Sequence, residues 1–256
     1  MLRRLDLNSD MGERDTADGM ALDAALMPLI TSVSIACGGH AGSRDLMRRT
    51  ASVAQQHGVA MGAHPGLPDR ETFGRTERPV TANEIRALVS EQVMVCGRVL
   101  KTEGFTLRHV KPHGALYTMA ARDEEIAEAI VSAVRDVDGA LLLYALAGSM
   151  LARVGKAAGL EIIQEGFADR AYRADGRLVS RSDSGALIED TDGVREQLRR
   201  LLNETVMTVD RRLIPMSIHS LCLHSDTPQA LVLARVIREE LQRNGIEVMA
   251  ASHDDR

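Results

Sequence analysis

Acidic, basic and imidazole side chains recur directly after the short apolar runs of this sequence. They are Asp10 and Glu13 after the first run, His40 after the second, His64 after the third, Lys111 and His113 after the fourth, and His224 and Asp226 after a later run. Histidine exchanges protons near neutral pH, and a neighbouring carboxylate can orient the ring or act as a base. A lysine can stabilise an oxyanion or hold a phosphate. The set predicts an enzyme active site.

The elements that must position these residues alternate along the chain. Strands are expected at 2–7, 33–36, 59–63, 107–110, 141–144, 161–164, 206–209, 217–223 and 246–249. Helices are expected at 20–27, 43–56, 81–102, 123–134, 149–158, 194–202 and 227–243. Ser43 is the expected N-cap of the second helix, and Thr81 with Glu84 forms an expected capping box.

Repeated strand-then-helix units predict a parallel sheet with right-handed crossovers, in the α/β class. About seven or eight units favour a closed or nearly closed parallel (β/α) barrel, whose catalytic groups lie at the carboxyl ends of the strands. The rhythm breaks only between Gly166 and Ile188, a stretch too long for an ordinary connection. Since no low-complexity linker divides the chain, residues 1–256 are expected to form a single catalytic domain.

Each candidate also has an ordinary structural explanation. Asp10 is equally compatible with a turn or a helix cap, and Glu13 with a solvated loop. His40 would serve to cap the helix that follows it, and His64 to fix a turn before Pro65. The coincidence of these residues at one rim favours function more than any single member does.

Two further chemistries remain open. Two or three of the histidines with Asp10 would suit Zn²⁺, but H-E-x-x-H does not occur, so a divalent metal is an unproven alternative. Cys37 near a histidine would suit a nucleophile, although a small core residue is the favoured interpretation. His109 is expected to pack within its strand rather than react.

The composition excludes several other classes of protein. A net charge of −5, no Trp, three Phe and three Tyr oppose a nucleic-acid partner. No apolar run approaches the length of a membrane span, and the N-terminus does not resemble a signal peptide. Three widely separated cysteines indicate a reduced, cytoplasmic compartment. No nucleotide-binding glycine motif is present, so any ATP is expected to bind to another polypeptide.

Several long motifs resemble the bacterial 5-oxoprolinase A-subunit family, also called the lactam-utilisation family. They are DLNSDMGE at 6–13, SIACGGHAGS at 34–43, GAHPGLPDRETFGR at 62–75, HVKPHGALY at 109–117, EGFADRAYRADGRLVSRSDSGALI at 165–188 and CLHSDTP at 222–228. The resemblance covers nearly the whole chain. It implies a seven-stranded barrel similar to carbohydrate deacetylases, and ATP-dependent opening of 5-oxo-L-proline to L-glutamate. It also implies two partner subunits, B and C, which would bind ATP as co-substrate.

The resemblance assigns two sets of site residues. The implied catalytic set is Asp10, Glu13, His40, His64, Lys111 and His113. The implied substrate-binding set is Asp69, Arg70, Arg75, Glu165, Arg170, Tyr172, His224 and Asp226. Within the first set, Asp10 or Glu13 would be the general base, and His113 or Lys111 would stabilise the oxyanion or the departing nitrogen. An arginine of the second set would pair with the substrate carboxylate.

The chain departs from the family pattern at a few positions. Gly39 replaces an aromatic residue beside His40, a change expected to enlarge the pocket, and Ser225 stands where glycine is common. Two other functions stay open on the sequence alone: a metal-dependent carbohydrate deacetylase, and a non-catalytic subunit that binds a lactam.

Overall fold

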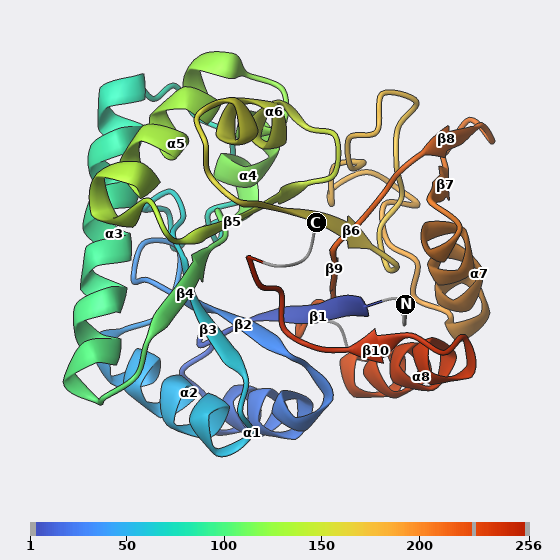
Figure 1. The fold of residues 1–256 in the computed structure, drawn as a ribbon, viewed down its shortest axis with the longest axis horizontal. Coiled ribbons are helices and arrows are strands. Elements are labelled where there is room, and N and C mark those ends of the chain that lie inside the picture. The colour runs from blue at the N-terminus through green and yellow to red at the C-terminus, as the bar shows by residue number, and fades with distance from the viewer. Residues whose placement is uncertain (1–3, 227–228, 254–256) are drawn as a thin grey trace.

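Seven parallel strands close into a barrel in a computed structural model that describes residues 4–226 and 229–253 (Figure 1). The strands are β1 (Arg4–Met11), β2 (Ser32–Ala36), β3 (Ala60–His64), β4 (Leu107–Val110), β5 (Leu142–Leu146), β6 (Ile162–Phe167) and β9 (Ser220–Cys222). Each pairs with the next, and β9 pairs with both β6 and β1, which closes the ring. The predicted barrel is confirmed.

An eighth strand lies next to β1 without entering the closed ring. This strand, β10 (Glu247–Val248), pairs with Arg4 and Leu5 at the start of β1. Farther along the same strand, Asp6–Asn8 pair with β9. Because β9 already closes the barrel, the choice between seven and eight strands resolves to seven.

Helices pack around the outside of the barrel (Figure 1). They are α1 (Ala17–Leu26), α2 (Arg44–Gln56), α3 (Ala82–Thr102), α4 (Gly114–Ala120), α5 (Glu124–Asp138), α6 (Met150–Ala157), α7 (Thr191–Leu202) and α8 (Ala230–Arg243), with a 3₁₀ turn at Met27–Leu29. Among the described residues, none of these helices is long and apolar enough to cross a bilayer.

The predicted helix caps are confirmed, and one helix was not predicted. The Ser43 hydroxyl accepts a hydrogen bond from Leu46 N at 3.1 Å, and both halves of the Thr81–Glu84 capping box are present. Helix α4 escaped prediction because it is only seven residues long and begins directly at Gly114. Gly114 has a φ of 54°, and a Cβ there would lie 2.5 Å from the carbonyl oxygen of Gly74. Glycine therefore lets the chain turn sharply after His113.

A histidine fills part of the barrel interior. His109 on β4 is buried, lies 3.2 Å from the Ser34 hydroxyl, and packs on Tyr144 with ring centroids 4.5 Å apart. On the neighbouring strand, a Cβ at Gly62 would lie 2.0 Å from the ring. Burial, aided by the charge of Lys111, lowers the pKa of His109 to about 3. The expectation that His109 packs within its strand is confirmed.

The long segment after β6 folds over the carboxyl end of the barrel. Isolated bridges join Arg170 to Leu187, and Tyr172 to Leu178 and Thr208. Beyond α7, β7 (Thr205–Met207) and β8 (Leu213–Pro215) form an antiparallel pair, of which only β7 was predicted. Residues of this segment between Arg173 and Ser182 lie at the rim where the candidate side chains end.

Candidate active site

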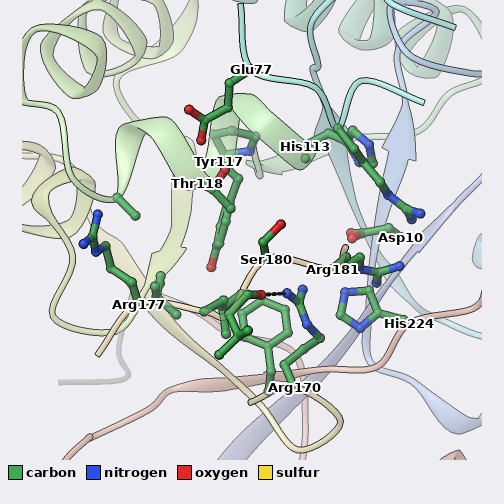
Figure 2. Close-up of a pocket in the computed structure, with 18 of the residues that line it drawn as sticks. Asp10, Glu77, His113, Tyr117, Thr118, Arg170, Arg177, Ser180, Arg181 and His224 are labelled. Atoms are coloured by element: carbon green, nitrogen blue, oxygen red, sulfur yellow. Dashed lines mark hydrogen bonds between the residues drawn. The ribbon is translucent and has the colours of Figure 1, made fainter. Parts of the chain in front are cut away.

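A cavity of about 820 Å³ lies at the carboxyl end of the barrel. Its floor includes Asp10, Glu13, His64, Lys111 and His113, which come from the ends of β1, β3 and β4. Residues of the segment from Arg173 to Ser182 also line the cavity. Figure 2 shows Asp10, His113 and His224 on one side of the cavity and Arg177 on the other. The barrel thus brings the predicted strand-end residues together.

Three histidines gather around Glu13 at four consecutive strand ends. Glu13 Oε1 lies 3.1 Å from His40 Nε2, 3.4 Å from His113 Nδ1 and 3.8 Å from His64 Nε2. One nitrogen or oxygen atom from each of the four side chains lies within 4.8 Å of the others. His40 sits behind the cavity floor, where it is buried against Gly66. A group of this composition can hold a metal ion.

Backbone carbonyls orient two of these rings. His64 Nδ1 lies 2.7 Å from the carbonyl oxygen of Lys111, and His113 Nε2 lies 2.8 Å from that of Phe73. A carbonyl can only accept, so these nitrogens carry the ring protons. Burial lowers the pKa of His64 to about 4, and burial together with the charge of His40 lowers the pKa of His113 well below its ordinary value. Both rings are therefore neutral at neutral pH.

Lys111 is buried at the cavity floor among acceptors. Its Nζ lies 2.7 Å from Glu165 Oε1, 3.0 Å from Asp10 Oδ1, 3.0 Å from Asn8 Oδ1 and 3.2 Å from Cys222 Sγ. Burial alone would lower the pKa of Lys111, but the charges of Asp10 and Glu165 outweigh burial and raise it well above its ordinary value. Lys111 is therefore protonated in this site at neutral pH.

Asp10 is the acidic partner of Lys111 on the cavity side. Its Oδ2 lies 3.4 Å from His64 Nε2, and its side chain is 13% exposed. Burial alone would raise the pKa of Asp10, but the facing His64 and Lys111 hold it well below its usual range. Asp10 therefore stays anionic throughout the physiological range.

Arg170 presents a buried guanidinium to the cavity. One of its terminal nitrogens donates to the carbonyl oxygen of Val179 at 2.6 Å, while its Nε has no hydrogen-bond partner in the described part of the chain. The residue is only 5% exposed. Burial and the nearby charge of Arg181 lower the pKa of Arg170 to about 10. A desolvated guanidinium that lines a cavity can bind an anion there.

Asp226 joins two other arginines at the cavity edge. Its Oδ2 accepts from Arg75 at 2.5 Å and from Arg181 at 2.8 Å. Burial would raise the pKa of Asp226, but Arg181 and His224 hold it below its usual range. Arg75 follows the third strand and Arg181 belongs to the long segment after β6. This carboxylate therefore ties the covering segment to the barrel.

His224 also lies at the cavity wall. Its Nδ1 lies 2.6 Å from Asp169 Oδ2, and its ring stacks on Phe167 with centroids 5.5 Å apart. The predicted positions of Arg75, Arg170, His224 and Asp226 all reach the cavity.

Four residues expected to bind substrate do not line the cavity: Asp69, Arg70, Glu165 and Tyr172. Asp69 accepts from the backbone nitrogen of Thr72 at 3.1 Å, which holds a turn. Arg70 donates to the carbonyl oxygens of Gly38 and Gly42 and so holds the loop after β2. These two residues belong to the loops that surround the site rather than to its wall.

The other two residues, Tyr172 and Glu165, lie behind the cavity wall. Tyr172 is fully buried, and its hydroxyl accepts from the backbone nitrogen of Phe167 at 2.7 Å. Glu165 is fully buried as well, where it contacts Lys111 and accepts from the Tyr117 hydroxyl at 2.7 Å. Glu165 lies within β6 and Tyr172 lies in the segment that follows it, and neither side chain lines the cavity.

Two expectations about the loop after β2 have clear outcomes. Cys37 is buried, its thiol lies 3.2 Å from the carbonyl oxygen of Ile35, and burial raises its pKa well above the usual value. The interpretation of Cys37 as a core residue is confirmed.

The expectation that Gly39 enlarges the pocket is wrong. A Cβ there would lie 2.6 Å from the carbonyl oxygen of Gly66 and 2.8 Å from Gln92, away from the cavity.

Three residues of the site were not predicted from the sequence, although residues close to them were. Tyr117 and Arg181 both line the cavity, and Phe73 supplies the carbonyl that orients His113. All three lie inside the quoted family motifs. Phe73 acts through its backbone, and Tyr117 and Arg181 do not directly follow a predicted strand, so the motif was the only available signal.

Comparisons with known proteins agree over the whole chain. The sequence model of the LamB/YcsF family matches residues 5–255. Among curated proteins, the A subunit of 5-oxoprolinase from Bordetella parapertussis is 48% identical over 248 residues, which is 96% of this chain and 98% of the relative. The A subunit of 5-oxoprolinase from Geobacillus thermodenitrificans is 44% identical over 256 residues, covering 100% of both chains.

Solved structures are also similar to this chain. A crystal structure described as a lactam utilization protein from Thermus thermophilus has a TM-score of 0.89 and is 39% identical, covering 97% of this chain and 100% of that one. A putative cellobiose-phosphate cleavage protein from Enterococcus faecalis has a TM-score of 0.59 at 11% identity, covering 97% of each chain. The latter likeness concerns the fold alone.

Proposed function

Because the chain belongs to the LamB/YcsF family, we propose that it is the A subunit of a 5-oxoprolinase and opens the ring of 5-oxo-L-proline to L-glutamate. Curated relatives that are 44–48% identical over nearly the whole chain carry that name. The observation that carries the proposal is the buried Lys111–Asp10 ion pair at the cavity floor, with its nitrogen and oxygen atoms 3.0 Å apart. It provides a fixed cation and a fixed anion where a small cyclic amide would bind.

A five-membered lactam needs activation before water can open it. Its nitrogen donates electron density into the carbonyl, which makes the carbon a poor electrophile. Phosphorylation of the amide oxygen by ATP would remove this donation and supply an activated carbon. We assign that step to the partner subunits B and C, since this sequence carries no recognisable nucleotide-binding motif.

Ring opening then requires that nitrogen leaves rather than phosphate. Water adds to the activated carbon to give a tetrahedral intermediate that carries hydroxyl, nitrogen and phosphate. If phosphate leaves first, the lactam re-forms and the ATP is wasted. If nitrogen takes a proton and leaves, the ring opens to an acyl phosphate. A second water then releases phosphate and L-glutamate.

Two residues at the cavity floor match these needs. Asp10 stays anionic and faces the cavity, so it accepts the proton from the attacking water. Because the phosphorylated carbon is already activated, a weak base suffices. Lys111 gives a proton to the departing nitrogen and regains one from Asp10, whose Oδ1 lies 3.0 Å from its Nζ. The neutral His113 is not the donor, because its ring proton is already directed to the carbonyl oxygen of Phe73.

Arg170 receives the carboxylate of the substrate in this mechanism. Its guanidinium lines the cavity, is 5% exposed, and forms no ion pair with any residue in the described ranges. A charge-assisted hydrogen bond to an anion in such a desolvated place is strong and directional. His224 and Asp226 also line the cavity.

We extend the proposal to the assembly and its location. Residues 1–256 act as one catalytic domain in the cytoplasm, and the partners hold ATP. The test is reconstitution: purified chain, purified partners, ATP and 5-oxo-L-proline should yield L-glutamate, and omission of this chain should abolish it. Glutamate formation that continues without the chain would instead indicate a non-catalytic lactam-binding role. Amide hydrolysis of an acetylated sugar by the chain alone would indicate a deacetylase.

A further inference from the structure

Two ring nitrogens face each other at the cavity floor. His64 Nε2 and His113 Nδ1 are 2.9 Å apart. A neutral imidazole has a single N–H, and each ring directs it outward to a backbone carbonyl, at 2.7 Å for His64 and 2.8 Å for His113. The two inner nitrogens therefore both present lone pairs. Lone pairs at this separation repel each other unless a positive charge lies against both.

A carboxylate adds a third donor to the same space. Glu13 Oε1 lies 3.4 Å from His113 Nδ1 and 3.8 Å from His64 Nε2. In a tetrahedral site with metal–ligand bonds near 2.0–2.1 Å, ligand atoms are about 3.3 Å apart. The three measured separations scatter around that value. A proton shared between the rings would satisfy one pair of atoms only, while a divalent cation satisfies all three.

His40 has a different part in the cluster. Its ring stacks on His113 with centroids 3.6 Å apart and planes inclined by only 7°. Imidazole lone pairs lie in the ring plane, so two parallel stacked rings cannot direct their lone pairs at one ion about 2 Å away. His40 Nε2 instead lies 3.1 Å from Glu13 Oε1, where it donates a hydrogen bond. It is a positioning residue for the carboxylate.

We propose that Glu13, His64 and His113 bind one divalent transition-metal ion, with Zn²⁺ as the preferred ion. Two imidazoles and one carboxylate form a donor set that suits Zn²⁺ and leaves a coordination position open toward the cavity. The outer contacts support each donor: carbonyls fix the tautomers of both rings, and His40 fixes Glu13. This inference concerns binding alone and does not depend on the lactam assignment.

The test loads the full-length protein with Co²⁺ after removal of metals by chelation. Titration should give visible absorption bands that saturate at one Co²⁺ per chain and disappear when Zn²⁺ displaces it. Glu13→Ala and His113→Ala should each weaken Co²⁺ binding by at least 100-fold. His57→Gln, at the exposed end of α2, is the matched control and should bind like the wild type.

X-ray absorption of the Zn²⁺-loaded wild-type protein decides the ligand set without any substitution, so a variant that fails to fold does not affect it. We expect two imidazole ligands and one carboxylate. His40→Gln should weaken binding by about 10–100-fold and keep the same two-imidazole signature. Absence of stoichiometric binding by the wild-type protein, three imidazole ligands, or unchanged binding by a folded His113→Ala variant would each overturn the proposal.

Discussion

Lys111 Nζ lies 2.7 Å from Glu165 Oε1, and the two side chains are only 3% and 0% exposed. The pair joins β6 to the end of β4 inside the barrel. An unpaired charge in such a place is costly because solvation is lost with nothing to replace it. The lysine that we place at the reacting nitrogen therefore also stabilises the barrel.

Removal of the lysine charge should therefore destabilise the folded protein. We expect Lys111→Met to lower the free energy of unfolding by about 3–5 kcal/mol, since it leaves Asp10 and Glu165 without their shared cation. Urea denaturation of the variant against the wild type measures the loss.

The double variant Lys111→Met/Glu165→Gln is the control for that result. It removes one uncompensated charge and keeps a side chain that can accept from Tyr117, so it should recover part of the lost stability. A double variant as unstable as the sum of both single variants would show that the two residues are not coupled.

The barrel was predictable because its strands follow a regular rhythm with clear caps. Ser43, Thr81 and Glu84 fix helix starts by local hydrogen bonds, which sequence reveals directly. The rim was predictable for a topological reason, since parallel strands deliver their carboxyl ends to one side.

Side-chain direction was not predictable in the same way. Tyr172 and Glu165 belong to a recognised motif, but whether a side chain faces the cavity or the wall behind it depends on three-dimensional contacts, such as that of Tyr172 with Phe167 and that of Glu165 with Lys111. Gly39 illustrates the same limit, because the direction of its missing Cβ follows from how the loop after β2 packs on Gln92.

Arg170 should control substrate affinity. We expect Arg170→Gln to raise KM for 5-oxo-L-proline by at least 10-fold, with a smaller effect on kcat, because binding to a remote carboxylate acts on ground state and transition state alike. Steady-state kinetics of the reconstituted complex measure both constants.

Arg98→Gln is the matched control, since Arg98 is exposed on α3 and does not line the cavity. It should leave both constants unchanged. An Arg170→Gln variant with wild-type KM would place the substrate carboxylate elsewhere.

Asp23 should make stability depend on pH. Burial, opposed in part by the hydrogen bond from Gly12 N, raises the pKa of Asp23 from 3.8 to about 6. Between these values the folded state binds more protons than the unfolded state, so stability falls as pH rises from about 4 to 6 and then levels off. We expect a loss of about 3 kcal/mol from this group.

Asp23→Asn tests the assignment, because the amide oxygen can still accept from Gly12 N and cannot ionise. Unfolding free energies at several pH values between 4 and 7 should give a smaller decline for the variant than for the wild type. Parallel curves for the two proteins would show that Asp23 does not titrate in this range.

The ratio of ADP to glutamate formed by an Asp10→Asn variant tests the central claim most directly. In the reconstituted complex, the partners would still phosphorylate the lactam, while the base for ring opening would be missing. We predict that glutamate formation falls by at least 100-fold while ADP formation persists, so that the ratio rises far above that of the wild type. Glutamate formed at the wild-type rate and ratio by a folded Asp10→Asn variant would contradict the placement of ring opening at this rim.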